Sequence, residues 1–246
     1  GDRVGGVVNI TSRSGYGNGF HSQFNINNQT ASGRVNIPVS KRSALQAAFR
    51  KTYYNKLGVL QKKAAEDYNT YFNFGDLNCK YSGYTKNGGT YYLSLLGSND
   101  AFTEYLDKDQ DDKTYLTDTE QGKIQRGGAL FYGKKWKKGG LTNTTLAYSS
   151  LESTFLNHSD FKDIAKGIDS NTYNSTANGI AELSLKTEHH FPTNKTHGLR
   201  IGGGFIQNTS TFYQDSTKQI LKFSADEISR VNAYVMDNFT LTPSIT

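Results

Sequence analysis

Cysteine, proline and tryptophan are scarce in this chain of 246 residues, which contains one Cys, three Pro and one Trp. The single cysteine, Cys79, excludes a disulfide framework and a cysteine-based zinc site within the chain. Since proline interrupts the hydrogen-bond ladder of a sheet, its scarcity is compatible with many long paired strands. The chain also lacks a Gly-x-Ser-x-Gly motif, so it offers no nucleophile elbow.

Long apolar runs are missing as well. Apolar residues make up 35% of the chain and the mean hydropathy is −0.64. No stretch approaches the roughly 18 apolar residues that a transmembrane helix requires. The strands of a transmembrane barrel are apolar on one face only, so average hydropathy does not separate such a barrel from a soluble β protein.

Glycine and aromatic residues are abundant instead, with 25 Gly, 16 Tyr and 14 Phe. Aromatic and glycine enrichment with little proline favours paired strands, aromatic girdles and tight turns. The net charge is +6, and the cations are dispersed apart from Lys134-Lys135 and Lys137-Lys138. We therefore expect no nucleic-acid partner.

Connectors that alternate between short and long divide the chain into strand-like segments. The short connectors are 38–42, 85–89, 137–140, 192–196 and 243–244, and the long ones are 56–70, 104–123, 156–176 and 212–228. Short turns on one side and long loops on the other are typical of a transmembrane barrel. The pattern predicts an all-β, antiparallel fold.

About ten strands are expected between these connectors. Their ranges are 19–28, 31–38, 43–55, 71–84, 89–103, 124–136, 141–155, 177–191, 197–211 and 229–242. Alternation is clearest in 181–191, where Leu183 and Leu185 share one face and Glu182 and Lys186 the other. A lipid-facing side and a wet lumen would produce this pattern.

The first fifteen residues differ from the repeated strands. Residues 5–15 (GGVVNITSRSG) combine a glycine pair, a β-branched run and a Gly-containing linker. They resemble the last plug strand and hinge of TonB-dependent outer-membrane receptors. Segments 76–81 (DLNCKY), 91–102 (YYLSLLGSNDAF) and 233–238 (AYVMDN) are similar to barrel segments of Bacteroidetes-type members of that family.

The resemblance implies a domain division and an architecture. Residues 1–15 would be the C-terminal end of a plug domain with its hinge, and residues 16–246 the N-proximal part of the barrel. The full barrel would have about 22 strands around a plugged lumen, of which this chain supplies about ten. A ten-stranded half-barrel would leave open edges in lipid, so we expect the intact protein to be longer.

The resemblance also implies a function. Such a receptor takes up a scarce ligand (siderophore, cobalamin, oligosaccharide or peptide) at the bacterial outer membrane, energised by TonB through a plug segment that is not in this sequence. Its other partners would be outer-membrane lipid and a surface lipoprotein. No catalytic residue or cofactor is required.

Charged residues on the non-lipid faces are the candidate site residues. These are Arg50, Asp76, Lys80, Glu182 and Lys186. We expect them to hold the plug through hydrated ion pairs, with lining of a substrate path as the alternative. Gly202, Gly203 and Gly204 lie within the predicted strand 197–211, and we expect them to let a large element such as the plug approach the wall.

Metal and catalytic sites are weakly indicated. Asp107, Asp109 and Asp111 have the early spacing of an EF-hand loop, but Asp112 replaces its glycine, Asp118 replaces its glutamate, and a solvated loop is expected. The adjacent residues His189 and His190 should point to opposite faces of a strand. An outer-membrane protease is the enzymatic alternative, with Asp100, Glu104, His158 and Asp160 as the residues that would have to meet.

Two non-enzymatic alternatives remain open from the sequence. One is a passive or adhesive outer-membrane barrel without a plug strand in its lumen. The other is a secreted β-rich carbohydrate-binding protein, in which Leu183, Leu185, Leu199 and Ile201 would lie in a packed core. A chain that stays monomeric and folded without detergent, or two sheets packed face to face over these leucines, would favour the second alternative over the barrel.

Overall fold

The computed structural model describes residues 14–15, 17, 19–53, 68–110, 112–137, 139–192, 197–217 and 220–239. These residues form ten strands. The strands are β1 His21–Ile26, β2 Thr30–Ser40, β3 Ser43–Thr52, β4 Tyr68–Tyr84, β5 Gly89–Gln110, β6 Lys113–Lys135, β7 Leu141–Asp163, β8 Ile168–Pro192, β9 His197–Ser216 and β10 Ile220–Phe239. Within the described ranges, no helix is long and apolar enough to cross a membrane.

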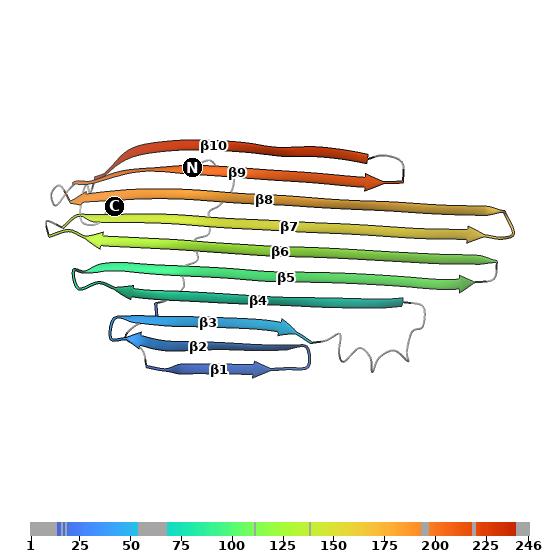
Figure 1. Cartoon of the computed structure of the whole chain (residues 1–246), viewed down its shortest axis with the longest axis horizontal. Helices are drawn as coiled ribbons and strands as arrows, with labels where there is room; N and C mark the ends of the chain where they lie inside the picture. Colours follow the sequence, from blue (N-terminus) through green and yellow to red (C-terminus); the bar gives the residue numbers. More distant parts are fainter. Residues whose placement is uncertain are drawn as a thin grey trace.

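The strands form one antiparallel sheet in which each strand pairs with its neighbours in sequence, in the order β1 to β10 (Figure 1). The register is continuous apart from irregularities between Pro38 and Ser40 and between Phe223 and Asp226. The predicted all-β, antiparallel, roughly ten-stranded fold is confirmed. Pairing with the adjacent strands explains how polar segments hold this shape, because the backbone groups of the inner strands β2 to β9 find partners on both sides.

Strands β5 to β10 extend much further at the Asp112 end than predicted, whereas β1 and β3 are shorter than predicted, and three of the four long connectors were wrong. The described residues of 104–123, 156–176 and 212–228 lie mostly on the paired strands β5–β10, and β7 and β8 are joined by a tight turn at Ile164–Gly167. Cross-strand pairs stabilise these polar hairpins: the rings of Tyr115 and Phe161 lie 4.9 Å apart, and Asn157 Nδ2 donates to Thr119 Oγ1 at 2.9 Å. In the remaining connector, 56–67 lies outside the described residues and 68–70 belongs to β4.

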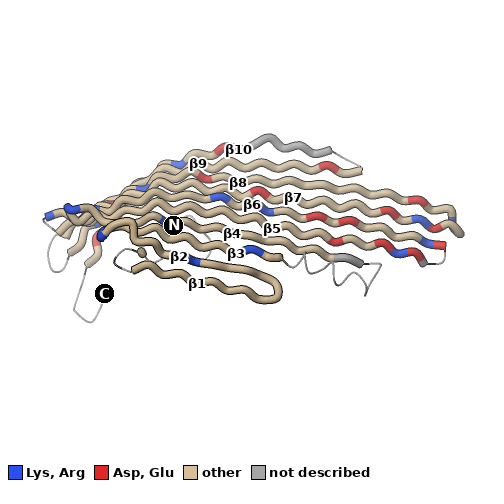
Figure 2. Tube along the Cα trace, turned by 60° about the horizontal axis from the view of Figure 1, so that its bottom comes forward, with Lys and Arg blue, Asp and Glu red and all other residues tan. Residues whose placement is uncertain are grey.

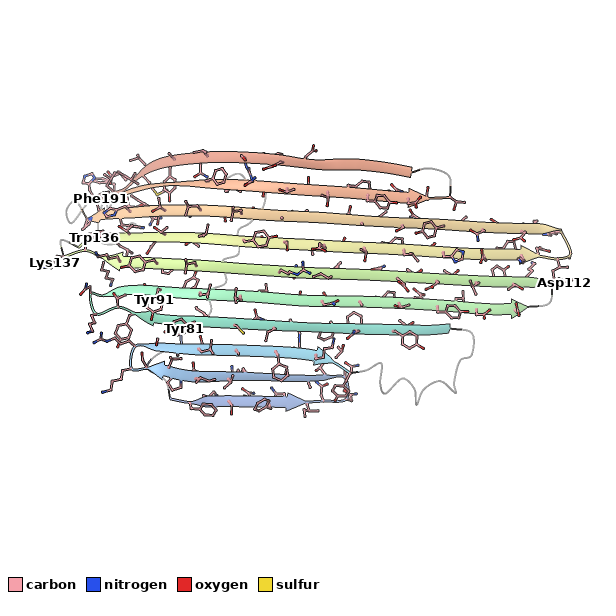
Figure 3. All side chains as sticks on the ribbon, viewed as in Figure 1. Tyr81, Tyr91, Asp112, Trp136, Lys137 and Phe191 are labelled. Atoms are coloured by element: carbon pink, nitrogen blue, oxygen red, sulfur yellow. The ribbon has the colours of Figure 1, made fainter. Side chains whose placement is uncertain are left out.

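The predicted short turns gather at one end of the sheet, which we call the Lys137 end; the opposite end is the Asp112 end (Figure 3). Turns follow Ser40, Tyr84 and Lys135 as expected, with Gly88 at φ 75° and Gly139 at φ 89°. Only glycine adopts these angles without strain, which explains its presence in both turns. The predicted turns at 193–196 and 243–244 fall outside the described residues.

The sheet is a single layer without a packed interior. Ala44 is the one buried hydrophobic side chain among the described residues, whereas Leu183, Leu185 and Ile201 are 40%, 45% and 41% exposed. No second sheet covers these side chains within the described part of the chain. This architecture contradicts the soluble alternative, which required them in a core.

Residues 1–13 lie outside the described residues, so most of the predicted plug strand is not placed. The adjoining residue, Gly15, is buried, and its carbonyl accepts a hydrogen bond from Asn36 Nδ2 at 3.3 Å. A Cβ at Gly15 would lie 1.9 Å from Asn36 Oδ1 and 2.8 Å from Gln46 Cγ. The chain therefore enters β1 in close contact with one particular face of β2 and β3.

Candidate functional site

The two faces of the sheet can be read from the register, because residues directly opposite each other on paired strands share a face. One row of such residues crosses the nine strands from β2 to β10, and every side chain in it is aliphatic or aromatic. We call it the apolar row. It consists of Ile37, Leu45, Tyr81, Leu93, Leu130, Leu146, Leu185, Phe205 and Val231. Leu130, Leu146 and Val231 are 54%, 44% and 82% exposed.

The face that carries the apolar row is uncharged over a limited height. On β6 the outward series runs Arg126, Gly128, Leu130, Tyr132, Lys134, so charge appears only at its two ends. From Arg126 to Lys134 the strand has the roughly nine to eleven residues that cross a bilayer. Arg126 forms an ion pair with Glu152 at 3.0 Å, with both side chains more than half exposed. This height is what a lipid-facing band requires.

One residue along every strand, on the opposite face, lies a row of different character. This polar row consists of Asn36, Gln46, Lys80, Ser94, Ala129, Ala147, Ser184, Ile206 and Arg230. All five predicted site residues share its face. The structure therefore places them together on the side away from the apolar row, and Gly15 contacts that same side through Asn36 and Gln46.

Within that face the predicted residues form separate contacts. The Arg50 guanidinium pairs with Asp76 Oδ2 at 2.8 Å, and Lys80 Nζ lies 4.8 Å from the centroid of the Tyr92 ring. The Asn208 amide lies between two charges; with its nitrogen turned towards Glu182, it would donate to Glu182 Oε2 at 3.1 Å and accept from Arg230 Nη2 at 3.3 Å. Only Arg50 and Asp76 are paired with each other among the five.

Lys186 stands apart from these contacts. It lies opposite Thr145 and Gly204, and its side chain is exposed. An exposed ammonium on a face rich in small and polar side chains is available to a partner or to water. The sequence predicted its face correctly but not its separation from the other four residues.

A polar cluster that the sequence interpretation missed lies towards the Lys137 end of the same face. The Tyr234 hydroxyl donates to Glu188 Oε2, and His190 Nε2 lies 2.6 Å from Glu188 Oε1. Arg200 Nε is 3.8 Å from the same carboxylate. The glycine at 202 was the available signal: a Cβ there would lie 2.5 Å from the Tyr234 hydroxyl, so Gly202 makes room for this side chain. The glycine run thus accommodates the sheet's own tyrosine at its first position.

His189 and His190 point to opposite faces, as predicted. His189 Nδ1 lies 2.5 Å from Thr142 Oγ1, and its ring contacts Phe191, with centroids 3.9 Å apart, on the face of the apolar row. His190 belongs to the Glu188 cluster on the other face. A single metal could not be bound by both rings.

A depression of about 380 Å³ lies on the polar face above the band. Its apolar lining is Phe72, Phe74 and Phe102, and its charged lining includes Arg50 and Lys123. Arg50 lies 4.8 Å from the centroid of the Phe74 ring while it pairs with Asp76. Aromatic rings beside a few fixed charges are the chemistry of a site for a small molecule.

The acidic segment with EF-hand-like spacing was expected to be a solvated loop, with loop calcium as the less favoured alternative, and its described residues lie mostly on strands instead. Asp107 and Asp109 are on β5 and Asp118 is on β6, whereas Asp111 lies outside the described residues. The pKa of Tyr105 is raised above its ordinary value, first by partial desolvation and then by the neighbouring Asp107 carboxylate. The Tyr105 hydroxyl donates to Asp107 Oδ2 at 3.3 Å. In the part of the chain that the structure describes, no group of three His, Cys, Asp or Glu side chains could hold a metal ion.

The four residues of the protease alternative are divided between the two faces. His158 and Asp160 lie 3.5 Å apart on the face of the apolar row. The register places Asp100 and Glu104 on the other face, where their cross-strand neighbours on β4 are Phe74 and Thr70. The sheet backbone separates the two pairs, so they cannot act together on one substrate bond.

Comparison with solved structures identifies two similar folds. The crystal structure of the unliganded ferric citrate transporter FecA matches with a TM-score of 0.51 and 11% identity over 87% of this chain. The ferric yersiniabactin uptake receptor FyuA from Yersinia pestis matches with a TM-score of 0.49 and 8% identity over 87% of this chain. This chain covers 34% and 35% of those proteins, about a third of their length. No family model and no curated protein matches the chain.

Proposed function

We propose that this chain forms part of the barrel wall of a TonB-dependent receptor in a bacterial outer membrane, which takes up a scarce ligand in an energised step. The observation that carries the proposal is the pair of adjacent rows: nine apolar side chains on one face, and a mixed polar row one residue further along every strand. A single-layer sheet with this division fits a wall between hydrocarbon and a wet interior. The fold shared with a ferric citrate transporter supports it.

The finer parts of the proposal rest on the sequence resemblance. Residues 1–15 are the end of the plug and its hinge, and residues 16–246 supply about ten of 22 strands in a Bacteroidetes-type barrel. The contact between Gly15 and Asn36 supports a chain that leaves the wall on its polar face. TonB acts on a plug segment outside this sequence, and a surface lipoprotein is a further partner.

The five predicted site residues hold the plug, in this proposal, through hydrated contacts on the polar face. Arg50 and Asp76 already pair with each other, so their contribution is a fixed dipole and not two free charges. Lys186, exposed and on the same face, is the residue of the five best placed to meet a plug carboxylate. Lining of the substrate path by the same residues is compatible with this geometry.

The depression beside Phe72, Phe74 and Phe102 is the proposed first contact of the ligand with this part of the wall. It lies beyond the uncharged band, on the face that would line the interior. Binding and release there require no bond chemistry, so the proposed protein is a transporter and not an enzyme. The ligand classes remain siderophore, cobalamin, oligosaccharide and peptide.

Uptake with and without TonB tests the proposal. Radiolabelled ferric citrate, cyanocobalamin, maltoheptaose and a tripeptide are offered to cells that express the receptor containing this chain, in a strain with TonB and in one without it. We expect one probe to accumulate only when TonB is present, and Phe102→Ala to lower that accumulation about tenfold because aromatic contacts are lost. Equal, non-accumulating entry in both strains would indicate the passive barrel instead.

A further inference from the structure

The two ends of the sheet carry opposite charge. Apart from Arg200, which pairs with Glu188, the described Lys and Arg residues at the Lys137 end are Lys41, Arg42, Lys86, Lys134, Lys135 and Lys137, which we call the basic rim. Figure 2 shows Lys and Arg gathered at this end and most Asp and Glu along the opposite half of the strands. The Asp112 end also has lysines, but there they alternate with carboxylates such as Asp107, Asp109 and Asp169.

The basic rim is not neutralised by the sheet itself. Among the described residues, no carboxylate lies within ion-pair distance of its six cations. Two described carboxylates occur near this end, and both have other partners: Glu188 binds Tyr234 and His190, and Asp237 Oδ2 lies 2.7 Å from His197 Nδ1. The rim therefore has an excess of positive charge.

Aromatic side chains extend from the apolar row, at Tyr81, to the rim, at Trp136. Lys134 Nζ lies 4.3 Å from the centroid of the Trp136 ring, and the Tyr81 and Tyr91 rings are 5.9 Å apart. Trp136 Nε1 donates to Thr142 Oγ1 at 2.8 Å, which fixes the indole in place. In Figure 3, Trp136 and Phe191 lie near Lys137, and Tyr91 and Tyr81 lie on the neighbouring strands β5 and β4 towards the same end. Tyrosine and tryptophan of this kind mark the headgroup level of a bilayer.

The height of the cations follows from the strand. Lys134 is two residues beyond Tyr132, the last outward residue of the uncharged band on β6. Lys41, Arg42, Lys86 and Lys137 lie in the turns immediately past that level and are exposed. A row of cations just outside a lipid-facing band meets the phosphate groups of the adjoining leaflet, and aromatic neighbours hold the level.

We propose that the basic rim binds the headgroup phosphates of anionic phospholipids in the leaflet at the Lys137 end. This rests on the proposed outer-membrane location, but it concerns a different surface from the ligand site. Lipid fits better than a soluble partner because the cations follow the edge of the band across β2–β7 and do not surround a cavity. Anionic phospholipid in that leaflet would then fix the depth of the wall and the end that inserts.

The test uses the receptor that contains this chain in nanodiscs of equal parts phosphatidylglycerol and phosphatidylcholine. Native mass spectrometry after release measures the ratio of the two lipids retained by the protein. The rim variant is Lys41→Gln/Lys86→Gln/Lys137→Gln, and its matched control is Lys108→Gln/Lys113→Gln/Lys166→Gln at the Asp112 end. All six lysines are exposed, and both variants lose the same charge.

At low salt, we expect the unmodified protein and the control to retain phosphatidylglycerol in preference to phosphatidylcholine. In the rim variant the ratio of retained phosphatidylglycerol to phosphatidylcholine should be about fivefold lower. High salt should remove the difference between the variants, since exposed charges are then screened. Equal retention by the rim variant and the unmodified protein would overturn the proposal, and so would an equal loss in the control. Lipid preference without TonB-dependent uptake would refute only the proposed transport function.

Discussion

The same strands have two different surfaces at two heights, and the comparison shows what each surface is for. At the height of Arg126 to Lys134 on β6, one face of the sheet is uncharged and apolar. The other face is small or apolar on β6 itself, with Gly127, Ala129 and Phe131, and is polar on neighbouring strands, for example at Lys80 and Ser94. Beyond Arg126 both faces are polar, as Thr119 against Asn157 on one and Asp118 against His158 on the other illustrate. Strand pairing continues unchanged across this boundary. Backbone pairing therefore determines the shape of the sheet, whereas the side chains determine whether each face is suited to lipid or to water.

The largest expected effect comes from placing a charge in the apolar row. Leu146→Lys should cost about 2–4 kcal/mol of folding free energy in a bilayer, because the ammonium would enter hydrocarbon. Urea titration of the folded protein in lipid vesicles, followed by heat-modified migration in gels, measures the change.

The control for this charge lies on the other face of the same strand. Ser149→Lys sits opposite Glu182 on the polar face, so its effect should stay within about 0.5 kcal/mol. Similar losses for the two lysines would remove the distinction between the faces.

A smaller loss is expected where the polar face is tightly packed. Gly202→Ala brings a methyl group to 2.5 Å from the Tyr234 hydroxyl. We expect a cost of about 1–3 kcal/mol in the same unfolding assay, because the ring must leave Glu188.

Two further variants separate this clash from a general intolerance of side chains on β9. Gly202→Ala combined with Tyr234→Ala should recover most of the loss caused by the clash. Gly198→Ala, whose nearest atom would be at an ordinary 3.9 Å, should be neutral or slightly stabilising. Equal destabilisation at 198 and 202 would contradict the packing explanation.

The smallest effect is expected for ion pairs, and it should differ between the two faces, because the Arg50–Asp76 and Arg126–Glu152 pairs lie at nearly the same height on opposite faces. A double-mutant cycle on Arg50 and Asp76 should give a coupling of about 0.5–1 kcal/mol, since Asp76 is only 22% exposed. The Arg126–Glu152 pair is 61% and 54% exposed, and its coupling should be closer to zero. A stronger coupling for the second pair would place that region in a less aqueous environment than proposed.

Much of the wall was predictable because one face had to be apolar. Alternation in 181–191 predicted the faces of Leu183, Leu185 and Glu182 correctly, and glycine-containing connectors predicted the turns after Tyr84 and Lys135. The outer halves of the strands were missed because strands with two polar faces show no period-2 signal. Their aspartates and lysines suggested loops, although the backbone hydrogen bonds continue there.

The candidate site was predictable in the same limited way. Parity along each strand placed Arg50, Asp76 and Lys186 on one face, but only the register shows that the first two form a pair. The contact between Glu188 and Tyr234 joins residues 46 positions apart across three strands. No local sequence pattern predicts a contact between residues so far apart in the chain. Gly202 by itself indicates that another group packs closely against the strand, but it does not identify that group as Tyr234.

The most direct test of the central claim compares two adjacent residues on β7 in lipid. In a Cys79→Ala background, a spin label at Leu146→Cys or at Ala147→Cys is exposed to oxygen, which partitions into hydrocarbon, and to a water-soluble nickel chelate. The account predicts that the label at 146 is relaxed mainly by oxygen and the label at 147 mainly by the chelate. Equal accessibility of the two labels to both agents would contradict a wall with lipid on one face and water on the other.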